Sequence, residues 1–194
     1  AGFEGSRGFT GRGIGVAVID TGVDATHPYL AGRVALSLDF TGTSVRRSPG
    51  RDENGHGTLV AGIIRAIAPG AHIVDLKAMG AEGSGFTSNV IAALNWATAN
   101  KAAWNLKVVN ISLGHGVMES ENDDPLCQAV QRATDAGMLV TVAGMRVPRT
   151  SMVSSVPGSL TVGETKAMAM GCPSVGLSAP LVISPTCVSP SKTR

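Results

Sequence analysis

The sequence has little charge, few aromatic residues, few cysteines and no long apolar run. Charged residues make up 15% and aromatic residues 4% of the 194 positions, while hydrophobic residues make up 43%. This composition is typical of one globular domain with its own core, and it excludes a highly charged disordered chain. The three cysteines, Cys127, Cys172 and Cys187, have no CxxC spacing, which argues against a disulfide framework and against a zinc site.

Charge and hydropathy also exclude two kinds of partner. The formal net charge is only +2, whereas nucleic acids and anionic membranes usually need a concentrated basic face, so we expect neither as a partner. No apolar run approaches the roughly 20 residues of a membrane span. The N-terminal AGFEGSRGFTGRG lacks the basic-then-apolar order of a signal peptide, so either none existed or the chain begins after its removal.

The last 49 residues differ in composition from the rest. Residues 1–145 carry 11 Lys and Arg against 13 Asp and Glu, whereas residues 146–194 carry 5 against 1. Every aromatic residue lies at or before Trp104, and six of the ten prolines follow Arg146. We therefore expect a domain over 1–145 and a divergent, poorly ordered tail over 146–194.

Within 1–145, short β-branched apolar runs alternate with longer segments of helical period. This alternation predicts an α/β domain with a mostly parallel sheet. The expected strands are 14–19, 73–78, 108–112 and 138–143, and the expected helices are 56–66, 87–101 and 123–136. The second helix would be capped by Thr87 or Ser88, and the third by Asp123 or Asp124 ahead of Pro125.

In such sheets, binding and catalytic residues usually lie at the carboxyl ends of the strands. Asp20, at the end of the first expected strand, is therefore a candidate functional residue. Asp20 closes the first strand in VIDTGVD, where a carboxylate can be held ionised in a partly dry site, although Asp-Thr-Gly is also common turn chemistry. His56 lies between two glycines at the start of an apolar helix, which lets the imidazole face a cleft. His27, His72 and His115 do not lie between two glycines at the start of a helix, and we interpret them as structural.

Six segments, in this order, resemble the subtilisin-like serine peptidases: GIGVAVIDTGVDATHP, DENGHGTLVAGII, APGAHIVDLKAMGAEGSGFTSNVIAALNWA, KVVNISLG, DPLCQAV and LVTVAG. The resemblance implies the three-layer fold of that family, with its C-terminal part incomplete here. It implies that Asp20 orients the imidazole and that His56 is the general base toward a serine nucleophile. An extended peptide or protein substrate would lie between two walls, formed by Ser112, Leu113 and Gly114 and by Gly83, Ser84 and Gly85.

Two departures concern the chemistry itself. Met145 stands where the family has its oxyanion asparagine, and a thioether donates no hydrogen bond to a developing oxyanion. No GTSMAxP-like segment carries a nucleophilic serine on a long helix. Ser151, in RTSMVSS, comes only six positions after Met145 and is followed by Pro157-Gly158, so we interpret it as a loop serine.

Other departures bear on ions and packing. Tyr29 stands where members with a tight calcium site have an aspartate, and AGIIRAIAPG lacks their calcium-holding insertion, so we expect no metal and no cofactor. Leu59 replaces the histidine usual in GTHVAG and makes that helix more apolar. Because a parallel sheet needs helices on both faces, an incomplete domain should expose apolar surface.

The sequence thus predicts a subtilisin-like serine endopeptidase in which only Asp and His of the triad are present, so the chain as given would be inactive. By resemblance it would be secreted or extracytoplasmic, and we expect a monomer. The alternative is a non-catalytic pseudopeptidase that binds extended peptides in the retained cleft. A nucleotide-binding domain is disfavoured because the glycines of GRGIG precede the first strand instead of following it.

The tail leaves two interpretations open. SSVPGSLTVGE is similar to a family segment in which Pro-Gly precedes a strand, which would indicate real divergence. Alternatively, a one-base deletion after Gly144 put the following codons out of frame. The coding DNA distinguishes the two, because only the second requires a downstream frame that encodes GTSMAxP.

Overall fold

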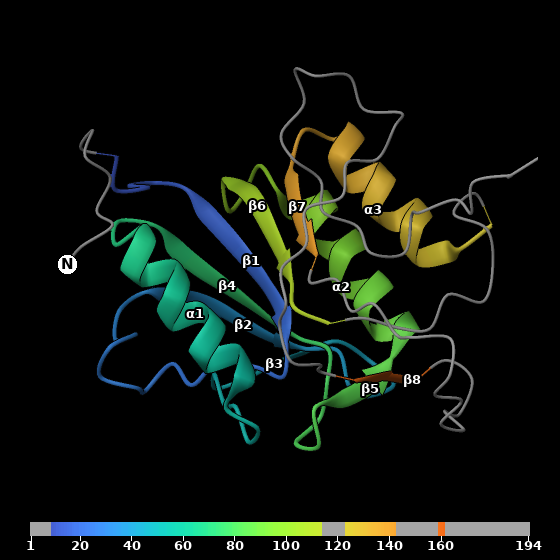
Figure 1. The fold of residues 1–194 in the computed structure, drawn as a ribbon, viewed down its shortest axis with the longest axis horizontal. Helices are drawn as coiled ribbons and strands as arrows, with labels where there is room; N and C mark the ends of the chain where they lie inside the picture. The colour runs from blue at the N-terminus through green and yellow to red at the C-terminus, as the bar shows by residue number, and fades with distance from the viewer. Residues whose placement is uncertain (1–8, 114–122, 143–158, 162–194) are drawn as a thin grey trace, which may run out of the picture.

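The computed structural model describes residues 9–113, 123–142 and 159–161. Its centre is a six-stranded sheet in the order β3-β2-β4-β1-β6-β7 (Figure 1). All neighbouring strands are parallel except β2 and β3, which are antiparallel. The strands are β1 (Gly15–Asp20), β2 (Val34–Asp39), β3 (Arg46–Arg47), β4 (His72–Lys77), β6 (Leu106–Ile111) and β7 (Leu139–Val142).

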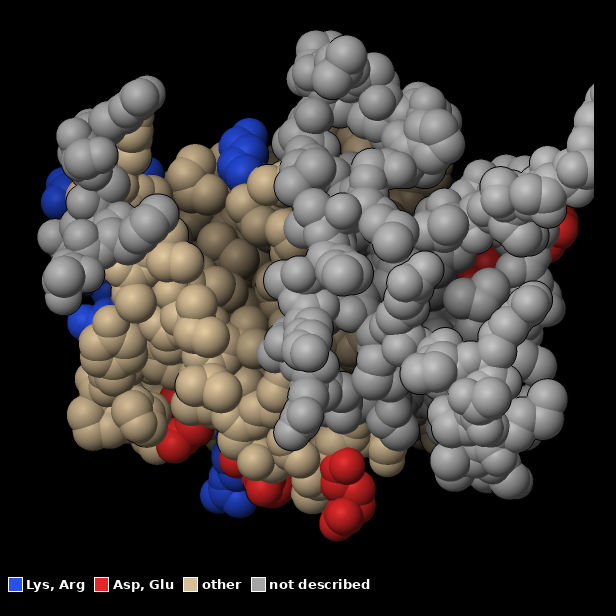
Figure 2. All heavy atoms as spheres, viewed as in Figure 1, with Lys and Arg blue, Asp and Glu red and all other residues tan. Residues whose placement is uncertain are grey.

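In the described part of the chain, three helices lie on the two faces of this sheet, so the predicted three-layer α/β architecture is confirmed. They are α1 (His56–Ile67), α2 (Thr87–Asn100) and α3 (Pro125–Asp135). Helices α2 and α3 pack over one face with the larger core cluster, while α1 packs over the other face against Val18 and Ile73. In Figure 2, which views the side of α1, the charged side chains lie around the edge of this face.

The four predicted strands are confirmed as β1, β4, β6 and β7. The burial of β1 explains why it could be recognised from the sequence. Every residue of β1 is buried, because β1 lies between β4 and β6 and has helices on both faces. Such a strand needs a continuous apolar run, and that run made it recognisable. The strand β2 was not predicted, although the second half of VALSLD alternates apolar and polar residues as half-buried strands do, and the two arginines of β3 carry no strand signal.

The helix predictions are confirmed in extent, but only one of the two caps is right. Asp124 caps α3, since its Oδ1 accepts hydrogen bonds from the amides of Leu126 (2.7 Å) and Cys127 (3.3 Å) with Pro125 in the first turn. In α2, Thr87 is already helical and the extended Phe86 occupies the cap position. The cause is a short strand, β5 (Ser84–Phe86), that runs directly into α2.

The strand β5 belongs to a second, two-stranded sheet. It pairs in antiparallel fashion with β8 (Ser159–Thr161), with Gly85 opposite Leu160. The domain boundary at 145 stays a prediction, since most of the residues after it lie outside the described part of the chain.

One buried carboxyl group on the side of α1 stands out. Asp75, in the middle of β4, is fully buried, and neither of its oxygens has a hydrogen-bond partner of good geometry among the described residues. Burial raises the pKa of Asp75 to about 7, although the Ser37 hydroxyl, the Val23 amide and the charge of Lys77 partly oppose this. The folded protein therefore favours the protonated, neutral acid.

This raised pKa predicts how stability depends on pH. Below about pH 4 both folded and unfolded chains hold the proton of Asp75, and above about pH 7 neither does. Between these limits only the folded state holds it, so the free energy of unfolding should fall by about 1.4 kcal/mol per pH unit as pH rises. Asp75→Asn should remove this dependence, as measured by urea unfolding at pH 5 and pH 8. Equal losses of stability over this range in wild type and variant would contradict the assignment.

Candidate active site

Asp20 and His56 come from different elements and meet at the carboxyl edge of the sheet. Asp20 is the last residue of β1 and is fully buried, while His56 is the first residue of α1. The His56 Nδ1 atom lies 2.8 Å from Oδ1 of Asp20, and the same oxygen accepts a 2.7 Å hydrogen bond from the Thr21 amide. The His56 side chain is 20% exposed, so the ring contacts the buried carboxyl and still reaches solvent.

Burial controls the electrostatics of this pair. It raises the pKa of Asp20, and the hydrogen bonds from His56 and Thr21 lower it only in part. The second oxygen, Oδ2, has no hydrogen-bond partner among the described residues. The Asp20 carboxylate therefore relies on the Thr21 amide and on the His56 ring, and when the ring donates from Nδ1, its Nε2 is left as the basic atom.

The glycines that flank His56 have separate structural roles. Gly55 lies just before α1 with φ of 94°, in the left-handed region that favours glycine. Gly57 is buried, and a Cβ atom at this position would overlap the carbonyl oxygen of Gly22 in the loop after β1. This close approach holds the start of α1 against the loop that follows Asp20.

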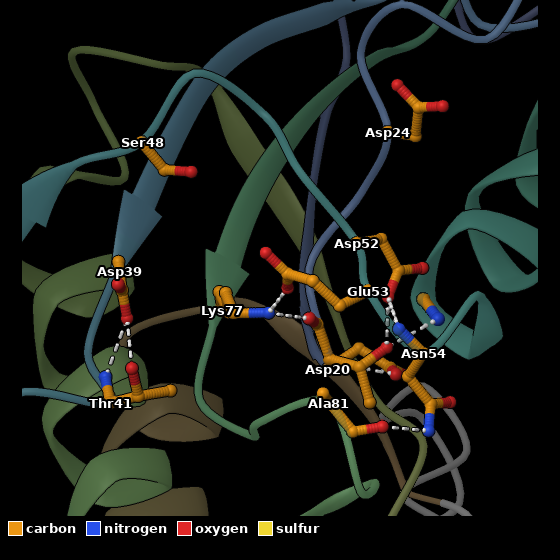
Figure 3. Close-up of polar contacts among 12 residues, drawn as sticks. Asp20, Asp24, Asp39, Thr41, Ser48, Asp52, Glu53, Asn54, Lys77 and Ala81 are labelled. Carbon is orange, nitrogen blue, oxygen red and sulfur yellow. Dashed lines mark hydrogen bonds and ion pairs between the residues drawn. The ribbon is translucent and has the colours of Figure 1, made fainter.

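Asp52 organises the segment that precedes His56, and sequence reasoning had given it no role (Figure 3). Its Oδ1 accepts hydrogen bonds from the Thr21 hydroxyl (2.9 Å) and from the amides of Asn54 (3.1 Å) and Gly55 (2.9 Å). Its Oδ2 accepts from the amide (2.9 Å) and the hydroxyl (2.6 Å) of Thr58. Burial raises the pKa of Asp52, but these hydrogen bonds outweigh it and hold the pKa below its ordinary value. The signal was an acidic residue just ahead of a helix N-terminus.

Two further contacts fix the loops around the pair. The Lys77 ammonium, at the end of β4, donates to the Thr21 carbonyl oxygen (2.5 Å) and to the Glu53 carboxylate (2.7 Å). The Asn54 side-chain amide donates to the Ala81 carbonyl oxygen (2.8 Å), which ties the segment before α1 to the loop after β4 (Figure 3). Through these bonds, the residues at the carboxyl ends of strands β1 and β4 form one polar cluster beside His56.

The residues predicted for the first substrate wall lie at this same edge. Ser112 and Leu113 directly follow β6 and are both buried, and the Asn110 side-chain amide donates to the Ser112 hydroxyl (2.6 Å). Because Ile19 pairs in register with Ile111, the two positions after them, Asp20 and Ser112, leave the sheet side by side. The predicted positions Gly114 and Met145 lie outside the described residues, as do Ser151 and His115.

The residues predicted for the opposite wall lie in the loop after β4 and in β5. Gly83 has φ of 68°, and the Gly80 amide donates to the Ser84 carbonyl oxygen (2.9 Å), so the loop closes on itself. A Cβ atom at Gly85 would lie 2.6 Å from the Ala78 carbonyl oxygen, which shows how closely β5 packs on the end of β4. The structure thus brings Ser84 and Gly85 to the loop that Asn54 contacts through Ala81.

The described residues offer no arrangement of three or more His, Cys, Asp or Glu side chains that could hold a metal ion. None of the described helices is both long enough and apolar enough to cross a membrane. Of the three histidines interpreted as structural, His27 and His72 each lie within hydrogen-bonding distance of a backbone group. Nδ1 of His27 accepts from the Tyr29 amide (3.2 Å), and Nε2 of His72 lies 2.8 Å from the Trp104 carbonyl oxygen.

Comparisons with known proteins give the same family in sequence and in structure. Subtilisin-like protease 3 of Arthroderma benhamiae is 35% identical over 165 residues, which cover 80% of this chain and 39% of that protein. Subtilisin-like protease 4 of Trichophyton tonsurans is 34% identical over the same length. Among solved structures, the S41 psychrophilic protease superposes with a TM-score of 0.61 at 35% identity, over 72% of this chain and 48% of that one. Sphericase gives a TM-score of 0.60 at 33% identity, over 70% of this chain and 47% of its own.

The chain therefore spans less than half the length of these relatives, and its fold is that of their matching part. The model of the subtilase family matches residues 11–174, which is most of the sequence. The chain belongs to the subtilase family, the subtilisin-like serine peptidases.

Proposed function

We propose that the chain is the front part of the catalytic domain of a subtilisin-like serine endopeptidase, in which Asp20 and His56 are two members of the triad. One observation carries the proposal. His56 Nδ1 lies 2.8 Å from Oδ1 of a fully buried aspartate at the end of the central strand, and the ring keeps a solvent-facing edge. A histidine placed this way can exchange protons at Nε2 with a group outside the core.

Each residue of the pair has a definite task in this proposal. His56 takes the proton of a serine hydroxyl at Nε2 and later gives it to the leaving amine. Asp20 holds the imidazole in the tautomer with the proton on Nδ1 and stabilises the imidazolium that forms. Because the Asp20 carboxyl is buried, its attraction for the imidazolium is screened less by water than it would be at the surface.

Substrate would bind as an extended peptide between Ser112–Gly114 and Gly83–Gly85. The support is the backbone of β5, which already accepts an antiparallel partner, since Ser84, Gly85 and Phe86 pair with the residues of β8. Peptides that add as a strand gain affinity from the same kind of main-chain pairing. We also propose that the whole protein acts as a monomer outside the cytoplasm, as the family resemblance implies.

We further propose that these 194 residues alone do not hydrolyse peptides. Met145 cannot donate to an oxyanion, and loss of that donor costs about 100- to 1,000-fold in rate in the subtilisin case. The sequence has no GTSMAxP-like segment, and loss of the nucleophile in subtilisin costs about a million-fold in turnover. Together these departures remove the nucleophile and the side-chain donor to the oxyanion, while the Asp-His pair remains.

The pairing of Asp20 with His56 can be tested without turnover. In the wild type we expect a downfield proton NMR resonance from the imidazole Nδ1–H, because the proton lies in a short hydrogen bond to a buried carboxylate. Asp20→Asn and His56→Ala should both abolish it. His72→Ala is the control and should leave it in place. A downfield resonance that survives Asp20→Asn would show that His56 does not donate to Asp20.

The missing nucleophile predicts the result of active-site labelling. A fluorophosphonate probe should leave the chain unlabelled, because no serine hydroxyl is activated by His56. The S41 psychrophilic protease serves as the positive control. Stoichiometric labelling that disappears in His56→Ala would show that the chain has a nucleophile, and Ser151→Ala would then test whether it is Ser151.

The second candidate is a pseudopeptidase that holds extended peptides, and the antiparallel pairing of β5 favours it. Calorimetry with hydrophobic tetrapeptides should then show binding in the high micromolar range, weakened because the peptide must displace Ser159–Thr161 from β5. Gly85→Val should abolish the heat, since a side chain there would overlap the Ala78 carbonyl oxygen. Absence of heat at millimolar peptide would exclude this function.

A further inference from the structure

Lys77, the last residue of β4, holds the backbone beside Asp20 in place. Its buried ammonium donates to the Thr21 carbonyl oxygen (2.5 Å) and to the Glu53 carboxylate (2.7 Å) (Figure 3). Thr21 is fully buried, and its amide donates to the same Asp20 oxygen that contacts the His56 ring. The bond from Lys77 therefore fixes the residue whose amide binds the Asp20 carboxylate.

A second acceptor for the Lys77 ammonium lies on the same face of β4. Side chains two positions apart in a strand point to the same side, so Asp75 and Lys77 both lie on the side of α1. Strand register places Asp75 between Val18 of β1 and Ser37 of β2. The Asp75 carboxyl is fully buried, and neither oxygen has a hydrogen-bond partner of good geometry among the described residues. This carboxyl group can therefore still accept a strong hydrogen bond.

The surroundings of Asp75 favour a move of Lys77 toward it. The Ser37 hydroxyl from β2 and the Val23 amide from the loop after β1 lie near the carboxyl group. The charges that act on it are those of Lys77 on its own strand and of Asp52 ahead of α1. Its neighbour on β1 and the buried side of α1 are apolar. An ionised Asp75 would thus be a buried anion near a second anion, and Lys77 is the cation that can neutralise it.

The proton on Asp75 decides which acceptor Lys77 prefers. Burial raises the pKa of Asp75 to about 7, so the carboxyl is neutral and attracts Lys77 little at weakly acidic pH. Once ionised, it attracts Lys77 from within the core, where water screens charges least. The competing Glu53 side chain is 52% exposed, so water can solvate its carboxylate when Lys77 leaves. Asp39, which is paired with Lys77 in register, already has Arg46 as its partner.

We propose that Lys77 is a positioning residue for the Asp-His pair and that Asp75 controls it. With Asp75 protonated, the Lys77 ammonium holds the Thr21 carbonyl oxygen beside Asp20. When Asp75 gives its proton to solvent, the ammonium moves to the new carboxylate, and Thr21 loses this bond. The inference rests on the proposed function of Asp20 and His56 and adds pH regulation to it. The pair is held firmly at weakly acidic pH and loosely at weakly alkaline pH.

The test follows Lys77 and His56 by NMR between pH 6 and pH 8.5. In the wild type, the ¹⁵Nζ chemical shift of Lys77, read through its Cε protons, should change with a midpoint at about pH 7. The downfield Nδ1–H resonance of His56 should lose at least half of its intensity over the same range. Asp75→Asn, which imitates the neutral acid, should abolish both changes and keep the resonance at pH 8.5.

Asp124→Asn is the matched control, since Asp124 is also a buried aspartate (7% exposed) but caps α3 on the other face of the sheet. Asparagine keeps the cap, so this variant should titrate like the wild type. In His56→Ala the Lys77 shift should persist, because it reports Asp75 and not the imidazole. If circular dichroism shows that Asp75→Asn is unfolded, Asp75→Ala replaces it with the same expected result.

Three results for Lys77 would overturn the proposal: no shift in the wild type, a shift that survives Asp75→Asn, or a shift that disappears in His56→Ala. A His56 resonance of equal intensity at both ends of the pH range would also overturn it, since Lys77 would then not position the pair. A wild type without that resonance at any pH would refute the proposed Asp-His pair as well. This last result differs from a resonance that ignores pH, so the two failures can be told apart.

Discussion

The hydrogen bond between the buried carboxyl of Asp20 and Nδ1 of His56 is the constraint around which the rest of the site is built. A carboxylate with no exposed surface is costly unless it is hydrogen-bonded, and here one oxygen has no partner at all among the described residues. The Asp20 carboxylate therefore relies on two donors, the His56 ring and the Thr21 amide. Any movement of α1 relative to β1 would break the first of these bonds, so the position of the whole helix matters to the charge at the end of the strand.

The neighbouring contacts can be understood as a means of preventing that movement. Asp52 binds the Thr21 side chain and the first turn of α1 with the same carboxylate, and thereby couples the end of β1 to the start of the helix. Gly57 allows the helix to approach the backbone of Gly22 closely, and Lys77 holds the Thr21 carbonyl from the neighbouring strand. The geometry of the pair thus rests on residues outside the pair itself.

The sequence predicted those parts of the structure whose signals are local. Strand β1 is a buried apolar run, β4, β6 and β7 each contain a shorter β-branched apolar run, and Asp124 ahead of Pro125 is a helix cap readable from adjacent residues. What it missed depends on contacts between distant segments. Strand β3 exists because Arg46 and Arg47 pair with β2, and Phe86 occupies the cap position of α2 because β5 precedes it. The position of Asp52 just ahead of α1 was a local signal, but its hydrogen bond from Thr21 joins residues 31 positions apart, and no spacing rule along one segment could reveal that contact.

Helix α1 joins the two main features of the molecule. Its first residue is His56, and its outer side exposes Leu59, Ile63 and Ile67, so the helix that holds the imidazole also carries exposed apolar side chains. Leu59 adds exposed apolar surface one turn from His56, while the contact between the His56 ring and Asp20 is in place. The Asp-His pair forms from the described residues because its bonds run inward, toward β1.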